Sequence, residues 1–287
     1  DAARRDFTVN ALYADVESGL VLDPTGGLAD LRERRLRTIG APEARLAEDP
    51  LRLLRLVRFA ARCDLEPVPE LVAAARSTAG AAAGLSAARV FDELTHAFVG
   101  RGRGRALRWL VELGLAAVLL PEVAAMDGVE QPPEYHPEGD VLTHVCRVLD
   151  AVPPDDPALA WRAVRHDIGK PGTFRRAADR IRFDGHDVLS AQLAEQVLRR
   201  LEAPASLREV VVDVCLQHIR FAALPAMKPV RAQRWLRTPT FPVHLEFHRA
   251  DCLGSHGRLD VYEFARAALA ALPPERPPLL GGADVLA

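Results

Sequence analysis

The sequence predicts a mostly helical protein that begins with a short β-containing segment. Strand signals are confined to residues 1–40, where "FTVNALYADV" alternates around β-forming residues and "GLVLDPTGG" and "RLRTIG" are short runs with turn residues. From Glu43 onward, Ala, Leu and Arg recur at helical spacing and β-branched runs are few. This pattern predicts helices at 48–62, 69–76, 86–99, 103–113, 140–151, 158–168, 186–202, 206–217, 229–236 and 244–254.

Composition favours a cytoplasmic globular protein. Of the 287 residues, 49% are hydrophobic and 26% are charged, and no apolar run is long enough to span a bilayer, so we expect no membrane partner. The four cysteines are widely spaced and form no CxxC pair, as expected of reduced thiols. The 37 basic and 39 acidic residues nearly cancel, so a nucleic-acid partner requires a local basic face.

Proline-rich segments suggest where the chain is divided. "EQPPEYHPEGD" at 130–140 is the best linker candidate, because proline interrupts helices and is disfavoured in sheets. The final segment, 272–287, is rich in Pro and Gly and is expected to be loosely packed.

The segment "EDPLRLLRLVRFAAR", residues 48–62, is the first that carries chemistry. Glu48 and Asp49 precede a proline, which favours a helix N-terminus. Arg55, Arg58 and Arg62 share one arc of the helical wheel, opposite an arc of apolar residues. One interpretation is an amphipathic helix with a solvated arginine face.

Asp49 and Arg52 support a second interpretation. Because they are three residues apart, they point to the same side of a helix. A carboxylate accepts from an exocyclic amino group, and a guanidinium donates to an unprotonated ring nitrogen. Together the two groups match the pairing edge of cytosine or adenine and mismatch guanine or uracil. The pair is therefore a candidate reader of nucleotide bases.

Four consecutive segments resemble motifs of one enzyme family. "RRDFTVNAL" (4–12), "DPTGGLADL" (23–31), "LRTIG" (36–40) and residues 48–62 are similar, in the same order, to motifs of the class II tRNA nucleotidyltransferases, which include CCA-adding enzymes and poly(A) polymerases. The resemblance implies nucleotide contacts from Arg4, Arg5, Asp6 and Asn10. It further implies that Asp49 and Arg52 select CTP and then ATP with support from Arg55.

The segment "LSAARVFDEL" (85–94) resembles the next part of the family pattern. There the resemblance implies that Arg89 and Glu93 brace the neighbouring helices. The alternative is an ordinary ion pair between the two residues, which are four positions apart on one helix.

Nucleotidyl transfer needs paired carboxylates that hold Mg²⁺. The family supplies them as an Asp-x-Asp pair upstream of these motifs, and the sequence contains no Asp-x-Asp near them. We therefore expect the chain to be a fragment that lacks the front of its head domain and to be inactive in transfer as it stands. Extension of tRNA with CTP and ATP by this chain would contradict that expectation.

The stretch "AVRHDIGKPGTF" (163–174) places His166 and Asp167 side by side before a glycine. At a helix end, both side chains can approach one centre. His144 on an earlier predicted helix and Asp251 on a later one could join them. Imidazole and carboxylate ligands from three helices suit a divalent cation with open positions for water.

This order of ligands resembles the HD phosphohydrolase superfamily over roughly residues 136–254. The resemblance implies metal binding by His144, His166, Asp167 and Asp251, with His186 and His218 at a possible second metal position. Lys170 follows the motif and is a candidate phosphate contact, so His166, Asp167 and Lys170 are the candidate catalytic residues. Mg²⁺, Mn²⁺, Ni²⁺, Fe²⁺ and Zn²⁺ all suit such donors.

The pattern predicts no metal-binding role for the other polar residues near it. Arg165 precedes His166 where the superfamily usually has an apolar residue, so its guanidinium is expected to reach solvent or find a partner. Four further histidines are treated as ordinary histidines without a functional role: His136, His244, His248 and His256.

The segment "GRGRGRALRWL" (100–110) is the candidate RNA contact, with flexible backbone around Arg101, Arg103, Arg105 and Arg108. The alternative is a solvated helix start. The expected partners are tRNA and nucleotides, and the resemblance implies that tRNA is read by its A-form shape and backbone.

The combined prediction has four parts. Residues 1–40 are the remnant of an α/β nucleotidyltransferase head, 41–130 a helical neck and body, 131–260 an all-helical HD domain and 261–287 a C-terminal tail. The favoured function is CCA addition to tRNA with an additional phosphohydrolase activity. A stand-alone HD phosphohydrolase or phosphodiesterase acting on nucleotides or RNA ends, and a non-catalytic RNA-binding module, are the alternatives. The same motifs fit CCA addition, A-only addition and poly(A) synthesis.

Overall fold

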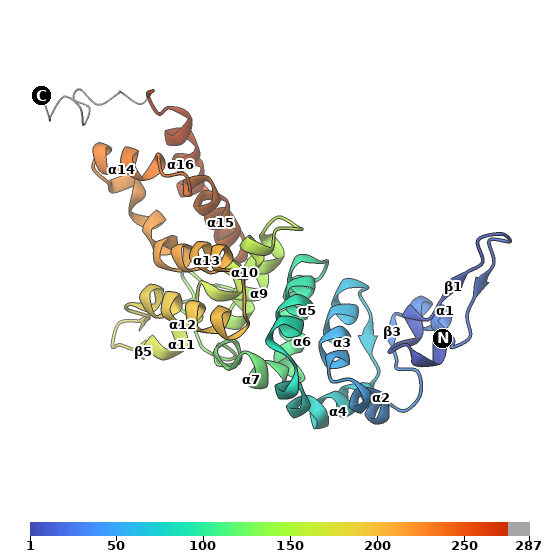
Figure 1. Ribbon diagram of the computed structural model, residues 1–287. Coiled ribbons are helices and arrows are strands. Elements are labelled where there is room, and N and C mark those ends of the chain that lie inside the picture. The colour runs from blue at the N-terminus through green and yellow to red at the C-terminus, as the bar shows by residue number, and fades with distance from the viewer. Residues whose placement is uncertain (275–287) are drawn as a thin grey trace, which may run out of the picture.

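The computed structural model describes residues 1–274 as a mostly helical chain, in which helical layers follow a small N-terminal segment (Figure 1). This confirms the predicted mostly α fold. The predicted loose tail at 272–287 lies largely outside the described residues. No helix in the described part is long and apolar enough to cross a membrane.

The N-terminal segment contains little regular structure. Strand β1 (Tyr13–Ala14) pairs antiparallel with β2 (Val21–Leu22), and β3 (Arg35–Leu36) pairs parallel with β4 (Glu66–Pro67). The remaining elements here are short helices: η1 (Ala2–Arg4), η2 (Thr8–Asn10) and α1 (Gly27–Arg32).

Part of the predicted "FTVN" strand is helical. The Asn10 side chain accepts a hydrogen bond from the Phe7 backbone N–H at 3.3 Å and donates one to Asp6, which closes a 3₁₀ turn instead of continuing a strand. Similarly, the Asp23 carboxylate accepts from the backbone N–H groups of Gly27 and Leu28 at the start of α1.

The central helices form the second part of the chain: α2 (Pro42–Glu48), α3 (Leu51–Arg62), α4 (Pro69–Thr78), η3 (Ala79–Gly84), α5 (Ala87–Val99), α6 (Arg103–Glu112), α7 (Leu115–Leu119) and α8 (Pro121–Ala124). The predicted helix 48–62 is divided. Glu48 ends α2, Asp49 is extended at φ −151° and ψ 105°, and α3 begins at Leu51. Pro50 explains the break, because the residue before a proline is disfavoured in the α conformation.

Two glycines of the "GRGRGR" segment allow α6 to pack closely against its neighbours. A Cβ at Gly102 would lie 2.6 Å from the Ala61 carbonyl oxygen at the end of α3, and Gly102 has a positive φ of 64°. A Cβ at Gly104 would lie 2.5 Å from the carbonyl oxygen of Cys146. These glycines therefore serve helix packing, which corrects the prediction of flexible backbone.

The C-terminal helices complete the described chain: α9 (Val141–Ala151), α10 (Pro157–Arg165), α11 (Lys170–Thr173), α12 (His186–Arg200), α13 (Ala205–Gln217), η4 (His218–Ala226), α14 (Pro229–Leu236), α15 (Phe241–Gly254) and α16 (Asp260–Ala270). A small antiparallel hairpin, β5 (Arg175–Arg176) and β6 (Ile181–Arg182), precedes α12. Asp140 and Asp156 cap α9 and α10 by accepting backbone N–H groups. Helix α16 occupies most of 261–270, which the sequence prediction assigned to the tail.

The main hydrophobic core is continuous from Phe7 to Ala250. A second, smaller core joins η4, α14, α15 and α16 around Phe221, Trp235 and Phe241. The main core positions the ends of α10 and α15 beside α9, which brings distant histidines and carboxylates together.

Candidate functional site

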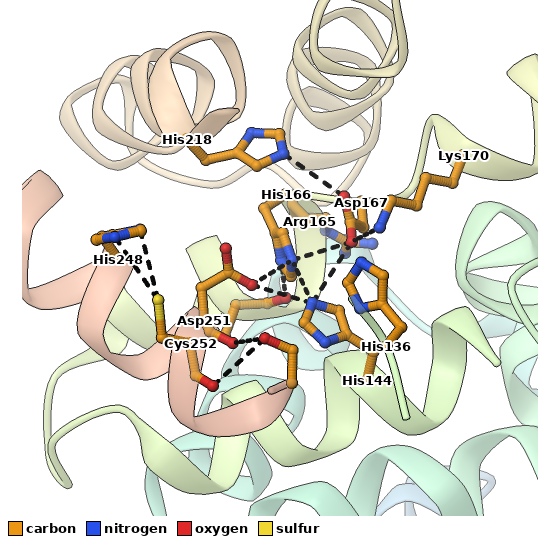
Figure 2. Close-up of polar contacts among 12 residues, drawn as sticks. His136, His144, Arg165, His166, Asp167, Lys170, His218, His248, Asp251 and Cys252 are labelled. Atoms are coloured by element: carbon orange, nitrogen blue, oxygen red, sulfur yellow. Dashed lines mark hydrogen bonds and ion pairs between the residues drawn. The ribbon is translucent and has the colours of Figure 1, made fainter. Parts of the chain in front are cut away.

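Four side chains named from the sequence meet between three helices (Figure 2). His144 lies on α9, His166 and Asp167 follow the last residue of α10, and Asp251 lies on α15. The Nε2 atom of His144 is 3.0 Å from Asp251 Oδ1 and 3.2 Å from His166 Nε2. Asp167 Oδ2 is 3.2 Å from His166 Nε2. All but Asp251 are almost fully buried.

The orientation of the imidazoles fits a cation. His166 Nδ1 is 2.9 Å from the Ala163 carbonyl oxygen and His144 Nδ1 is 2.8 Å from Glu138 Oε1, so both Nδ1 atoms act as donors. In the neutral rings, both Nε2 atoms then present lone pairs to each other at 3.2 Å. Two ligands bonded to one ion at about 2.1 Å stand roughly 3.0–3.4 Å apart, so the spacing of the two Nε2 atoms matches that of ligands to a shared metal ion.

A second group repeats this geometry on the other side of Asp167. His186 at the start of α12 and His218 at the start of η4 have their Nε2 atoms 3.2 Å apart. Their Nδ1 atoms contact the carbonyl oxygens of Phe183 and Cys215 at 2.8 and 2.7 Å. Asp167 Oδ1, which has no hydrogen-bond partner among the described residues, is 3.5 Å from His186 and 3.6 Å from His218. Asp167 thus directs one oxygen to each histidine pair.

The buried charges of the cluster shift one another's pKa values. Burial opposes a charged His144, but the carboxylates of Asp251 and Glu138 raise its pKa to about 9. Burial also opposes a charged Asp167, yet the positive charges of His166 and Lys170 hold its pKa well below the usual range. A bound cation would replace the histidine protons as the counter-charge.

Sequence reasoning missed two residues of this site, both in the predicted linker. Glu138 Oε1 accepts from Nδ1 of His144 at 2.8 Å and from Nδ1 of His136 at 2.9 Å. Although burial favours its neutral form, these hydrogen bonds lower the pKa of Glu138 to about 2. Metal-binding histidines usually donate their other ring N–H to a carboxylate, so an acid close to His144 was the available signal.

Lys170 is buried, with its ammonium 2.7 Å from Asp167 Oδ2 and 2.6 Å from Gln131 Oε1. An ammonium has three donors, which leaves one for a phosphate oxygen. The Lys170 ammonium and the histidine pairs line a cavity of about 790 Å³, which is large enough for a nucleotide-sized ligand. His136, His248 and His256 line it as well, although the sequence assigned them no role.

Arg165 behaves differently from the prediction. Its side chain is fully buried, so it does not reach solvent, and its three guanidinium nitrogens have no hydrogen-bond partner among the described residues. The guanidinium lies 4.9 Å from the ring centroid of Trp161. Burial lowers the pKa of Arg165 to about 9 while the Glu122 carboxylate opposes the shift, so the group is still charged at neutral pH.

The predicted nucleotide-contacting residues lie at the junction of the N-terminal segment with α3. Asp6 is buried, accepts from Arg55 Nε at 2.5 Å and is also bonded to Asn10. Arg4 and Arg5 are exposed beside it. Arg55 is therefore joined to Asp6 and not directly to the Asp49–Arg52 pair.

Asp49 and Arg52 have separate partners in this structure. Asp49 accepts from Arg89 of α5 at 3.2 Å, while Arg52 contacts Glu48 at 2.5 Å and the Arg45 carbonyl oxygen at 2.7 Å. A nucleotide base read by both residues must replace these contacts.

Glu93 connects two helices. It accepts from Arg58 of α3 at 2.7 and 3.2 Å, and no ion pair between Glu93 and Arg89 is present among the described residues. The bracing of α3 against α5 therefore agrees with what the family resemblance implies, and the ordinary pair within one helix does not form. The arginine face of α3 is largely paired, not simply solvated.

Three of the four predicted RNA-binding arginines have structural partners. Arg103 is buried and donates to the carbonyl oxygens of Asp150, Val152 and Pro153 at the end of α9, so it caps that helix. Arg105 pairs with Asp64 and Glu66, and Arg108 pairs with Asp127. Arg101 is exposed and has no ion pair among the described residues. Because Arg103 is buried and its guanidinium donates to backbone carbonyls, it does not present the exposed charge that the predicted RNA contact requires.

Family models and curated relatives point to the same enzyme family. A model described as the poly A polymerase head domain matches residues 1–37, and one described as a probable RNA and SrmB-binding site of polymerase A matches residues 64–127. A "Multifunctional CCA protein" of Azoarcus sp. (strain BH72) is 37% identical over 269 residues, covering 90% of this chain and 64% of the relative. The protein of the same name from Leptothrix cholodnii is 36% identical and covers 90% and 63%.

The family models, the relatives and the solved structures together support the class II CCA-adding enzyme and poly(A) polymerase family for this chain. The chain spans less than two thirds of the length of these relatives.

Solved structures of the family have the same fold. The CCA-adding enzyme of Bacillus stearothermophilus in complex with CTP is 25% identical with a TM-score of 0.60, covering all of this chain and 63% of that one. A tRNA-processing enzyme with CTP is 18% identical with the same TM-score and covers 96% and 69%.

The two family-model matches include different parts of the candidate sites. Asp6 and Asn10 lie in the head match, and Arg89 and Glu93 lie in the RNA-binding match. The histidine cluster lies outside both matched ranges. The interpretation of this cluster as a metal site therefore depends on the geometry of its side chains.

Proposed function

We propose that this chain is part of a tRNA nucleotidyltransferase that adds CMP and AMP to the 3′ end of tRNA. The observation that carries the proposal is the 37% identity, across 90% of the chain, with a relative named Multifunctional CCA protein. The substrates are CTP, ATP and tRNA, and Mg²⁺ serves the transfer. Asp49 and Arg52 present the acceptor and the donor that complement the amino group and ring nitrogen shared by cytosine and adenine.

Incorporation assays test this proposal. Because the printed sequence has no Asp-x-Asp pair, we expect this chain alone to add no CMP or AMP to tRNA that lacks its 3′ end. A chimera that carries the preceding residues of the Azoarcus relative should add both, and Asp49→Ala in the chimera should reduce its preference for CTP and ATP over GTP and UTP. Incorporation of CMP or AMP by the chain alone would contradict the expected inactivity. A folded chimera that adds neither nucleotide would contradict the proposed function.

A second activity is favoured by the paired imidazoles that face each other at 3.2 Å. We propose that the cluster holds two divalent cations, one with His144, His166 and Asp251 and one with His186 and His218, while Asp167 contributes to both. Bound cations supply an activated water and neutralise phosphate charge. Such a site would hydrolyse phosphoesters of nucleotides or RNA ends. Mg²⁺, Mn²⁺, Ni²⁺ and Fe²⁺ all suit the mixed donors.

The residues of the chain itself orient the site. Glu138 fixes the tautomer of His144, so that Nε2 faces the cluster. Lys170 holds Asp167 and has a donor left for a phosphate oxygen. Arg180, Arg182 and Arg258 line the same cavity and add positive charge around an anionic substrate.

Glu138→Gln is expected to lower metal affinity and hydrolytic activity by about 10–100-fold, because the amide is a weaker acceptor for the His144 ring N–H. Titration of hydrolysis with Mn²⁺ measures the effect, and excess Mn²⁺ should restore part of the activity. Glu134→Gln, an exposed acid in the same loop, is the matched control. Equal Mn²⁺ requirements in the two variants would show that Glu138 does not position His144.

A further inference from the structure

A basic surface lies near the C-terminal end of the described chain, apart from the arginines predicted to bind RNA. Residues 214–245 contain five basic residues and no Asp or Glu, although the whole chain has slightly more acidic than basic residues. The basic residues are Arg220, Lys228, Arg231, Arg234 and Arg237. Lys228, Arg231 and Arg234 are exposed at the start and on the outer side of α14.

The helix that carries these cations is firmly placed. Trp235 and Leu236 of α14 are buried in the second hydrophobic core, against Phe221 and Phe241. Arg220 stacks on Trp235 at 4.3 Å and joins η4 to α14. The opposite side of α14 therefore faces solvent in a fixed orientation.

The positive charges on this surface are not neutralised within the described chain. No ion pair joins Lys228, Arg231 or Arg234 to an acid among residues 1–274. Two acids of the neighbouring helices already have partners, since Glu246 pairs with Arg249 and Glu263 with Arg266. Burial lowers the pKa of Arg220, and the nearby positive charge of Arg231 lowers it further.

We propose that Lys228, Arg231 and Arg234 form a second RNA-binding surface that contacts the phosphate backbone of structured RNA. Unpaired cations on a rigid helix gain most from a polyanion, because binding releases condensed counterions. Trp235 is buried under Arg220, so no aromatic ring of this helix is free to stack on a base. The contact is therefore to backbone and independent of sequence.

The surrounding residues favour RNA over a lipid surface. Val230 is the one large apolar side chain strongly exposed on α14, at 80%, and an eight-residue helix offers little apolar area for a bilayer. The preceding element, η4, contributes Ile219 and Ala222 to the lining of the histidine cavity. RNA held on α14 thus lies along the element that leads to that cavity. This inference shares its RNA partner with the proposed function but does not require hydrolysis.

The test compares two triple variants. Lys228→Gln/Arg231→Gln/Arg234→Gln removes the surface, while Arg175→Gln/Arg199→Gln/Arg266→Gln removes three exposed arginines that already pair with acids. The Kd for a tRNA transcript is measured as a function of KCl concentration. The first variant should bind at least about 10-fold more weakly near 0.1 M salt, with a slope of log Kd against log salt reduced by about 2–3. The second should match the unaltered chain.

Each outcome bears on the proposal. Unchanged affinity and salt slope in the first variant overturn it, and so does equal weakening in both variants. Binding of the unaltered chain to vesicles of 3:1 phosphatidylcholine and phosphatidylglycerol, lost in the first variant while tRNA binding persists, also overturns it. Absence of tRNA binding by the unaltered chain overturns the proposed tRNA partner itself. Equal thermal stability and an equal far-UV circular dichroism spectrum confirm that the first variant is folded.

Discussion

Asp167→Asn is expected to lower metal-dependent phosphoester hydrolysis by at least about 10³-fold, because bound cations contribute several kcal/mol to transition-state stabilisation. Asp167 is the residue that both histidine pairs share: one carboxylate oxygen lies 3.2 Å from His166 and the other 3.5 Å from His186. An amide has one neutral oxygen, so one proposed cation position loses its ligand and the other keeps only a weaker, uncharged one.

Hydrolysis of bis-p-nitrophenyl phosphate after chelator treatment and addition of Mn²⁺ measures this effect. The chelated protein should be inactive and Mn²⁺ should restore it, whereas the Asn variant should stay inactive and bind less Mn²⁺. His96→Ala, which removes an exposed imidazole outside the cluster, is the control. Full activity of the Asn variant, or metal-independent hydrolysis by the unaltered chain, would remove the basis for a metal centre.

Arg165→Met is expected to raise the free energy of unfolding by about 1–3 kcal/mol, the opposite of the usual effect of a core substitution. The buried guanidinium loses its hydration and finds no acceptor among the described residues. A methionine keeps an unbranched apolar stem in this position, beside Trp161, without the buried charge.

Arg162→Met provides the matched control for this prediction. Arg162 is also buried, on the same helix, but donates to the Val210 carbonyl oxygen at 3.2 Å. Its replacement should not stabilise the protein, because it leaves that oxygen without its donor. Thermal and urea unfolding measure both variants. A loss of stability in Arg165→Met would mean that the guanidinium has a compensating interaction.

Local sequence signals predicted the helices well, and periodicity located α4, α5, α6, α9, α12, α13 and α14 within a few residues. The four side chains that meet in the cluster were named because their order along the chain resembles the HD phosphohydrolase superfamily. The sequence prediction began this helix at residue 48 and missed α2, whereas the structure ends α2 at Glu48 and begins α3 at Leu51, after Pro50.

Other features could not be predicted because they depend on distant parts of the chain. Glu138 and His136 lie in an aperiodic proline-rich loop, so no spacing rule connects them to His144. The arginines of 100–110 look equivalent in sequence. Arg103 differs because its guanidinium donates to carbonyl oxygens at the end of α9, which is distant in the chain. Helix α16 lies next to a Pro-rich segment and was absorbed into the predicted tail.

The close packing of α6 links the two ends of the molecule. Gly102 lies against α3, which carries Arg52 and Arg55, and Gly104 lies against α9, which carries His144. A bulkier side chain at either position would push apart the two helices that α6 holds together. The helix that carries Arg52 and the helix that carries His144 therefore share one continuous core, and severing the chain between them would leave each half with an uncovered apolar face.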